Sequence, residues 1–250
     1  MDARRDDSNV VLETAKLMVR FGGLVAVNGV DMTLRQGEVR GLIGPNGSGK
    51  TTFINLVTGI YQPTGGKVHL LGEDITAMSP DKITSRGLMR TFQLPRVFGN
   101  MTLLENMLVP RFADIDRDYR RQLPGAIEKA DGLLAAVDLR RLRDEQAKTL
   151  SGGQKALLQL ARGLMPEHVA AFMLDEPFAG VNMVIKETMM RLISEKAAEG
   201  VAFLLVSHEM TSIRTMCPTV TVLAEGSIIA EGTMDAIASM DHVIEAYLVG

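Results

Sequence analysis

A glycine-rich segment in the N-terminal part of the chain constrains the fold most strongly. Residues 44–51 read GPNGSGKT and match the pattern G-x-x-x-x-G-K-[ST]. An apolar strand pattern over 38–43 precedes them, and an apolar helical pattern over 50–57 follows. Strand, glycine loop and helix in this order form a phosphate site, because loop N–H groups and a helix N-terminus point at the anion. These flanks favour a phosphate loop over a chance glycine turn.

Each part of this loop has an expected role. The backbone would surround the phosphates, Lys50 would reach the outer ones, and the Thr51 hydroxyl would bind magnesium. The predicted phosphate-binding residues are Gly44, Pro45, Asn46, Gly47, Ser48, Gly49, Lys50, Thr51 and Thr52.

The remaining patterns predict an α/β fold. Short apolar stretches broken by glycines over 10–40 indicate an antiparallel β subdomain, and helical patterns over 102–150 indicate an inserted helical subdomain. Strands alternate with helices over 170–223, which is typical of a mostly parallel sheet covered on both faces. We expect one domain over residues 1–250, with the helical subdomain at about 100–165.

Two carboxylates end the apolar stretch Phe172-Met173-Leu174. At the carboxyl edge of a parallel sheet, Asp175 and Glu176 would lie in the ligand crevice beside the phosphate loop. Asp175 could hold Mg²⁺, and Glu176 could orient and deprotonate an attacking water. Alone, two acids at this position are equally compatible with an ordinary strand end; the nearby phosphate loop favours the functional interpretation.

A second anion site is predicted at residues 150–154, which read LSGGQ. Ser151 is a natural helix N-cap, and the two glycines leave backbone N–H groups open. The chain has one copy of each site. Two chains that meet head to tail could therefore place both sites on one nucleotide.

GPNGSGKT, LSGGQ and MLDEP in this order resemble the nucleotide-binding subunit of ABC transporters, from about residue 12 to the end. LSGGQ is that family's own signature. The resemblance implies the ABC nucleotide-binding fold, ATP and Mg²⁺ as ligands, and ATP hydrolysis coupled to transmembrane transport. It also implies a homo- or heterodimer in which the ATP-binding residues in trans are Ser151, Gly152, Gly153 and Gln154.

The resemblance assigns further residues. Gln93 matches a loop glutamine that senses Mg²⁺ and the attacking water, and His208 matches a histidine that contacts the γ-phosphate. Phe21 resembles the aromatic residue that stacks on adenine, although a core phenylalanine is the alternative. Asn182 stands where most relatives have an aspartate at the dimer contact, so this position offers hydrogen bonds without charge.

Within the family, the chain is most similar to ATP-binding subunits of branched-chain amino acid and amide importers. The similarity rests on RFGGLVAVNGV, EVRGLIGPNG, RTFQ, MTLLEN, IAEGT and AYLVG. It implies integral membrane permeases, a second ATP-binding subunit and a solute-binding protein as partners. DEPFAGV instead resembles lipopolysaccharide-export ATPases, which makes a lipid exporter the alternative.

Apolar side chains follow Gln93. Leu94, Val97 and Phe98 would form an exposed patch where the family docks its membrane subunit, a costly arrangement unless it is part of an interface. The alternative is that Phe98 packs inward under the helical subdomain.

Composition limits the remaining function classes. A net charge of −3 argues against a nucleic-acid partner, and no apolar run approaches the ~20 residues of a membrane-spanning helix. With one cysteine and no apolar leader, we expect a peripheral protein on the cytoplasmic face of the inner membrane. DNA-repair or chromosome-organising ABC ATPases need zinc-binding cysteines or a long coiled coil. The sequence shows neither feature, which argues against that class. A regulatory switch that binds nucleotide without fast hydrolysis remains an alternative function. Such a switch would not need Glu176 or LSGGQ, so their presence favours an ATPase.

Overall fold

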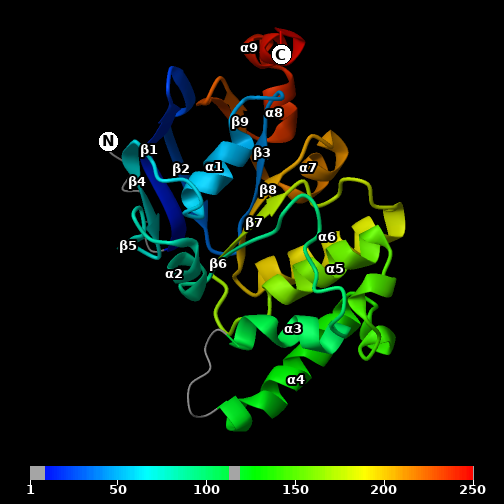
Figure 1. Cartoon of the computed structure of the whole chain (residues 1–250). Coiled ribbons are helices and arrows are strands. Elements are labelled where there is room, and N and C mark those ends of the chain that lie inside the picture. Colours follow the sequence, from blue (N-terminus) through cyan, green and yellow to red (C-terminus); the bar gives the residue numbers. More distant parts are fainter. Residues whose placement is uncertain (1–8, 113–118, 250) are drawn as a thin grey trace.

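The computed structural model describes residues 9–112 and 119–249. Within these ranges, the centre of the molecule is a six-stranded sheet in the order β10-β9-β3-β8-β7-β6 (Figure 1). Neighbours from β9 to β6 are parallel, and β10 is antiparallel to β9. The expected mostly parallel sheet is confirmed. Its strands are β3 (Val39–Ile43), β6 (Leu88–Arg90), β7 (Ala171–Asp175), β8 (Ala202–Val206), β9 (Thr219–Ala224) and β10 (Ser227–Gly232).

The N-terminal part forms a separate antiparallel sheet in the order β2-β1-β4-β5. The expected antiparallel arrangement is confirmed: β1 (Val10–Phe21) and β2 (Leu24–Arg35) form a hairpin with its turn at Gly22 and Gly23. The sheet also includes β4 (Gly65–Leu70) and β5 (Glu73–Asp74), which the sequence patterns did not predict. Helix α1 (Lys50–Val57) lies between the two sheets (Figure 1).

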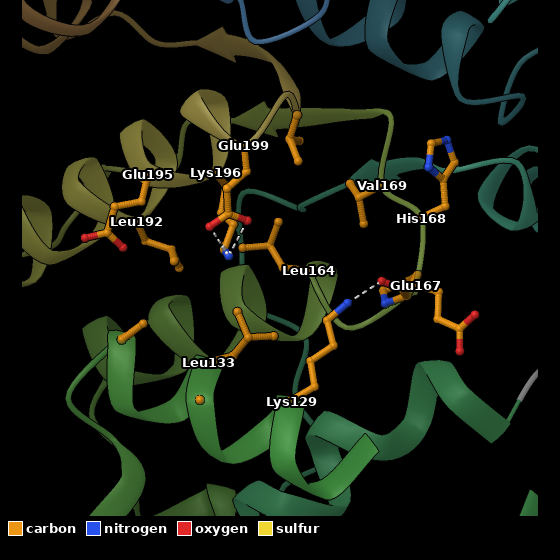
Figure 2. Close-up of a pocket in the computed structure, with 14 residues that line it drawn as sticks. Lys129, Leu133, Leu164, Glu167, His168, Val169, Leu192, Glu195, Lys196 and Glu199 are labelled. Atoms are coloured by element: carbon orange, nitrogen blue, oxygen red, sulfur yellow. Dashed lines mark hydrogen bonds and ion pairs between the residues drawn. The ribbon is translucent and has the colours of Figure 1, made fainter. Parts of the chain in front are cut away.

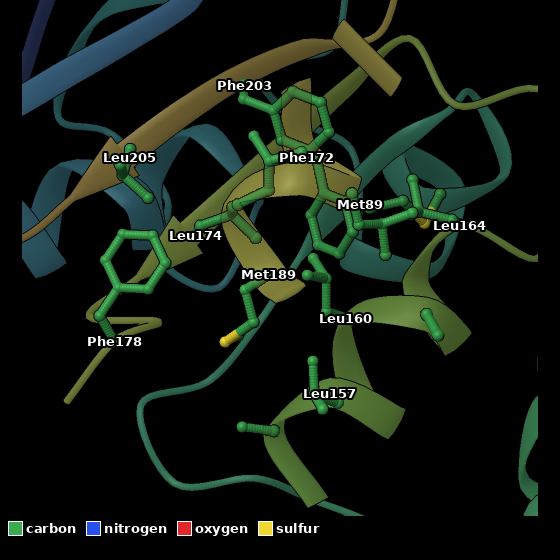
Figure 3. Packing of buried hydrophobic residues seen from close by; sticks show 14 of the residues in the cluster. Met89, Leu157, Leu160, Leu164, Phe172, Leu174, Phe178, Met189, Phe203 and Leu205 are labelled. Carbon is green, nitrogen blue, oxygen red and sulfur yellow. The ribbon is translucent and has the colours of Figure 1, made fainter. Parts of the chain in front are cut away.

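Both faces of the parallel sheet are buried. Along β7, Ala171 and Met173 join the apolar cluster shared with α1, whereas Phe172 and Leu174 join the cluster on the opposite face. The same alternation runs along β8. Figure 3 shows the second cluster, where Phe172 stacks on Phe203 with ring centroids 6.0 Å apart. A strand buried on both faces must be apolar throughout, which explains the continuous apolar patterns in the sequence.

Helices α3 (Leu103–Phe112), α4 (Tyr119–Ala136) and α5 (Gly152–Gly163) form a helical group below the parallel sheet (Figure 1). Thr102 and Glu105 form the predicted capping box before α3, since each side chain accepts a hydrogen bond from the other's backbone N–H, at 3.1 and 2.7 Å. The group lies in the part of the chain where a helical insertion was expected. The boundaries of this subdomain, at about residues 100–165, remain a prediction.

The other helices connect or flank the strands. They are α2 (Pro80–Ser85), α6 (Met183–Ala198), α7 (Met210–Met216), α8 (Met234–Ala238) and α9 (Asp241–Val249). In the described ranges, no helix combines the length and the apolar character needed to cross a bilayer.

Candidate active site

The carboxyl ends of three parallel strands bring most of the predicted site residues together. A cavity of about 600 Å³ lies where β3 leads into the phosphate loop, β7 ends at Asp175 and β8 leads to His208. Of the residues predicted from the sequence, the cavity is lined by Asn46, Gly47, Gly49, Lys50, Thr51, Thr52, Gln93, Asp175, Glu176 and His208. Parallel strands that end at one edge account for this convergence.

The phosphate loop is fixed from two sides. Gly49 is the N-cap of α1 with φ 103°, and a Cβ there would lie 2.4 Å from the Ala26 carbonyl oxygen, so a larger residue would force β2 and the loop apart. The Gly226 N–H donates to the Ser48 carbonyl at 3.0 Å from the β9–β10 turn. The N-cap residue Gly49 has no side chain that could cap α1, so the first N–H groups of the helix are available to an anion.

Lys50 is held inside its own loop. Its ammonium donates to the carbonyl oxygens of Gly44 at 2.8 Å and Pro45 at 2.9 Å, and to Ser48 Oγ at 3.3 Å. Partial burial lowers the pKa of Lys50, an effect that the nearby carboxylates of Glu176 and Asp175 oppose. The side chain is thus positioned at the cavity and would exchange carbonyl partners for phosphate oxygens.

The two carboxylates that end β7 lie in different surroundings. Asp175 is buried, and burial raises its pKa, while Arg90 acts in the opposite direction from 3.7 Å. Glu176 adopts φ 50°, an uncommon conformation for a residue with a Cβ, and its N–H donates to the Val206 carbonyl at 2.8 Å. This backbone turns the Glu176 side chain toward the end of β8.

Glu176 contacts His208. Glu176 Oε1 lies 2.8 Å from His208 Nδ1, while the histidine side chain is 75% exposed and the glutamate 13%. A carboxylate that orients an imidazole at the mouth of a phosphate cavity can organise a water and the terminal phosphate. The geometry therefore brings together the two residues that the sequence predicted as base and phosphate contact.

Gln93 lines the cavity from a segment that α5 holds in place. Gln159 of α5 accepts the Arg96 N–H at 2.7 Å and donates to the Phe92 carbonyl at 3.1 Å, on either side of Gln93. Movement of α5 would therefore move the Gln93 loop. The sequence did not identify Gln159, because nothing in its helical surroundings marks it as different from a surface glutamine.

Arg90 is a second residue that the sequence analysis missed. Besides its proximity to Asp175, its guanidinium donates to Asn55 Oδ1 on α1 at 2.7 Å and to Oγ1 of Thr58, the C-cap of α1, at 3.2 Å. It connects the helix that follows the phosphate loop with the predicted metal ligand. The contact requires β6 to pair with β7, so no local sequence signal could have revealed it.

The predicted trans residues lie outside the cavity. Ser151 caps α5 in a complete capping box with Gln154, whose N–H donates to Ser151 Oγ at 3.3 Å and whose Oε1 accepts the Ser151 N–H at 2.9 Å. Neither Ser151, Gly152, Gly153 nor Gln154 is among the residues that line the cavity. Their separation from Lys50 is what a site completed by another chain requires.

Phe21 and Asn182 are both on the surface. Phe21 is 46% exposed and meets Tyr61 edge to face, with centroids 5.4 Å apart, so the alternative of a core phenylalanine is wrong. Asn182 is the N-cap of α6, and its Oδ1 accepts the Ile185 N–H at 3.0 Å. Its side chain thus has a structural role within the chain.

A second cavity, of about 510 Å³, lies between α4, α5, α6 and the segment before β7 (Figure 2). Its lysines contact groups of the protein itself: Lys129 Nζ donates to the Pro166 carbonyl at 2.6 Å, and Lys196 Nζ lies 2.7 Å from both Glu199 oxygens. None of the predicted site residues lines it. The cavity at the strand ends is therefore the better candidate site.

Comparisons with known proteins agree with this geometry. A family model described as ABC transporter matches residues 27–179. The chain is also 39% identical, over 95% of both chains, to the probable branched-chain amino acid transport ATP-binding protein LivG of Archaeoglobus fulgidus. The chain belongs to the ABC transporter family. A second relative of this ABC chain is the high-affinity branched-chain amino acid transport ATP-binding protein BraF of Pseudomonas aeruginosa, 38% identical over 96% of this chain and 98% of that protein.

Solved structures show the same ABC fold. The ADP conformation of an ATP-binding cassette of an ABC transporter superimposes with a TM-score of 0.85 at 32% identity, covering 96% of this chain and 99% of the other. A nucleotide-free cassette gives a TM-score of 0.83 at 32% identity, covering 95% and 98%. As a member of this family, the chain is a nucleotide-binding ATPase that works with a membrane transporter.

Proposed function

We propose that this chain is the ATP-hydrolysing subunit of an importer for branched-chain amino acids or related amino acids and amides. The observation that carries the proposal is the convergence of Lys50, Asp175, Glu176 and His208 on one cavity at the strand ends. The solute class follows from the names of the relatives.

The residues present fit ATP and Mg²⁺. The uncapped N-terminus of α1 and the loop backbone suit phosphates, and the Thr51 hydroxyl, Asp175 carboxylate and Gln93 amide supply the oxygen ligands that Mg²⁺ prefers. Bound Mg²⁺ would neutralise charge that develops on the phosphates. Glu176 would take a proton from the attacking water, and His208, oriented by Glu176, would contact the γ-phosphate.

The site would be completed in a head-to-tail dimer. Ser151 to Gln154 lie outside the cavity of their own chain. The capping box of α5 uses the N–H groups of Ser151 and Gln154, so those of Gly152 and Gly153 stay outside it, and Ser151 and Gly152 are exposed. Such a surface suits the γ-phosphate held by another ATP-binding subunit, whether identical or not. Asn182, which caps α6 with its Oδ1, would contribute mainly through its amide NH₂ group at this interface.

Phe98 and Leu94 form an exposed apolar surface that would dock the permease. Leu94 is 80% exposed and Phe98 47%, so the inward-packing alternative for Phe98 is wrong, whereas Val97 packs partly against the helical group. Buried Asn106 fixes the Phe98 backbone: its Oδ1 accepts the Phe98 N–H at 2.8 Å, and its Nδ2 donates to the Phe98 carbonyl at 3.0 Å. A rigid exposed phenylalanine is a good interface anchor, since little entropy is lost on binding.

Phe98→Ala tests this docking surface. We expect the melting temperature and the ATPase activity of the isolated subunit to stay near the parental values, because the ring is half exposed. Co-purification with the permeases and solute uptake should fall. Loss of an interface anchor typically costs more than ~1 kcal/mol of binding free energy, about fivefold or more in affinity.

Leu71→Ala is the matched control, since Leu71 is 53% exposed but follows β4 on the antiparallel sheet. It should leave permease binding unchanged. A Phe98→Ala subunit that melts several degrees lower yet binds the permeases at parental strength would remove the docking proposal.

The lipid-exporter alternative rested on Phe178 in DEPFAGV. Phe178 is buried at 5% exposure and belongs to the apolar cluster beneath the parallel sheet (Figure 3). A residue that packs in the core carries no information about the direction of transport or the solute. The relatives named above favour the importer.

Uptake of radiolabelled leucine by cells that depend on this chain tests the importer proposal. In this importer the chain would be the peripheral subunit on the cytoplasmic face of the inner membrane, and its partners would be integral membrane permeases and a solute-binding protein. We expect uptake with the parental chain and background uptake with Glu176→Gln. If cells with the parental chain take up leucine, other amino acids and amides only at the background rate, while the ATPase activity is intact, the proposed solute class is wrong. The assignment as an ATPase would still hold.

A further inference from the structure

The proposed mechanism gives no role to a buried lysine on α6. Lys186 is 9% exposed, and its ammonium donates to Glu209 Oε1 in an ion pair. Its Nζ also lies 5.9 Å from the centroid of the buried Phe178 ring (Figure 3), within the ~6 Å range of a cation–π contact. Glu209 directly follows His208 in the chain, and Phe178 lies two residues after Glu176. One ammonium therefore contacts both segments that carry the proposed phosphate contact and the proposed base.

Both carboxylate oxygens of Glu209 are occupied. Oε1 accepts from Lys186, and Oε2 accepts from the hydroxyl of buried Ser212 at 3.1 Å. The Glu209 N–H donates to Oγ of buried Ser207 at 3.1 Å. The hydrogen bond from Lys186 lowers the pKa of Glu209, so this side chain is a carboxylate at neutral pH. The side chain and the backbone of Glu209 are thus fixed together.

The position of the His208 ring depends on this fixation. The side chain is 75% exposed, and among the described residues its ring has Glu176 Oε1 as its one hydrogen-bond partner. A ring with so few contacts takes its position mainly from the backbone of its own segment, which Glu209 holds on the other side. Helix α6 is a rigid support for this contact, because its residues Met189 and Leu192 are buried in the core.

We propose that Lys186 is a positioning residue for His208: it binds the Glu209 carboxylate and thereby holds the adjacent imidazole where the γ-phosphate would lie. The inference rests on the proposed contact of His208 with the γ-phosphate of ATP. Without the ammonium, Glu209 keeps its bond to Ser212 but loses its link to α6. Its negative charge then also stands unbalanced near an anionic ligand. Both changes weaken the binding of ATP and spare that of ADP, which lacks the γ-phosphate.

Lys186→Met tests the inference, because methionine is uncharged and of similar length, and the 43% exposed Glu209 side chain can still be hydrated. Every chain in the series carries Glu176→Gln to prevent turnover. By titration calorimetry, we expect the dissociation constant for ATP to rise about two- to thirtyfold, the usual effect of a residue that acts on a site through another. The dissociation constant for ADP should change less than about twofold. A lysine with only a structural role would lower the melting temperature and affect both nucleotides alike.

Lys196→Met is the matched control on the same helix. Lys196 pairs with Glu199 and does not line the cavity at the strand ends, so the affinities for ATP and ADP should both stay unchanged. An equal loss of ATP affinity in Lys196→Met would indicate a general disturbance of α6 and overturn the inference. Unchanged ATP affinity in Lys186→Met would overturn it as well.

A double-mutant cycle with His208→Ala shows whether Lys186 acts through the histidine. If it does, adding Lys186→Met to His208→Ala should raise the dissociation constant for ATP less than about twofold. A further rise as large as that in the single variant contradicts the inference. If His208→Ala itself leaves ATP affinity unchanged, the proposed phosphate contact fails and the inference fails with it. If His208→Ala weakens ATP binding and Lys186→Met does not, the inference alone is wrong.

Discussion

Glu176→Gln is expected to reduce steady-state ATP hydrolysis about 10²- to 10⁴-fold, the usual contribution of a general base, while ATP binding is kept. Glutamine has the shape of glutamate and can still hydrogen-bond His208 Nδ1, which lies 2.8 Å from Glu176 Oε1. It cannot take a proton from water. ATP should therefore accumulate unhydrolysed between two subunits, and size-exclusion chromatography with ATP should show a stable dimer.

Glu187→Gln is the control for this variant. Glu187 is an exposed carboxylate on α6 and does not line the cavity, so its replacement should change turnover little. Parental turnover in Glu176→Gln would show that another group accepts the proton, and the assignment of Glu176 as base would be wrong.

Lys50→Ala is expected to weaken ATP binding and reduce turnover together. Each charge-assisted hydrogen bond from Lys50 to a phosphate oxygen contributes about 1.5–3 kcal/mol, so loss of one raises the ATP dissociation constant about tenfold to 150-fold. The carbonyls of Gly44 and Pro45 also lose their donor, which should lower the stability of the loop. Calorimetric titration with ATP, beside a thermal melt without ATP, measures both effects.

Lys67→Ala provides the comparison, because Lys67 is an exposed lysine on β4 that pairs with Asp74 at the surface. Surface ion pairs contribute little, so ATP binding and stability should both stay near the parental values. Equal ATP affinity in Lys50→Ala and Lys67→Ala would refute the phosphate-loop assignment.

The central strands could be predicted because their signal is local. Residues in β7 and β8 are buried on both faces, so these strands appear in the sequence as continuous apolar runs between turn signals. The phosphate loop was predictable for the same reason, since its glycines, lysine and flanking strand and helix lie within one short segment. Placement of Asp175, Glu176 and His208 near that loop required only the rule that parallel strands end at one edge.

Other parts of the fold depend on partners far away in the chain. β6 has three residues and β5 two, too few for a periodic pattern, and β4 is stabilised by pairing with β1. The approach of Arg90 to Asp175 requires β6 to lie beside β7. None of these contacts leaves a local mark in the sequence, because they result from tertiary pairing.

The sequence did not decide whether Phe98 is buried or exposed, for a related reason. A phenylalanine is usually buried, and the sequence alone could not show that Asn106 bonds to both backbone groups of Phe98 and fixes its position. Sequence patterns identified the motifs, and the structure was needed for the contacts that connect them.

Steady-state phosphate release from Mg²⁺·ATP by the purified chain tests the central claim that this ABC subunit is an ATPase and not a nucleotide-binding switch. Because the proposed site is completed by a second subunit, we predict saturable turnover whose rate per chain rises with chain concentration or on addition of the partner ATP-binding subunit, and which is lost in Glu176→Gln. Tight ATP binding without phosphate release by the parental chain, alone and with its partner subunits, would contradict the account.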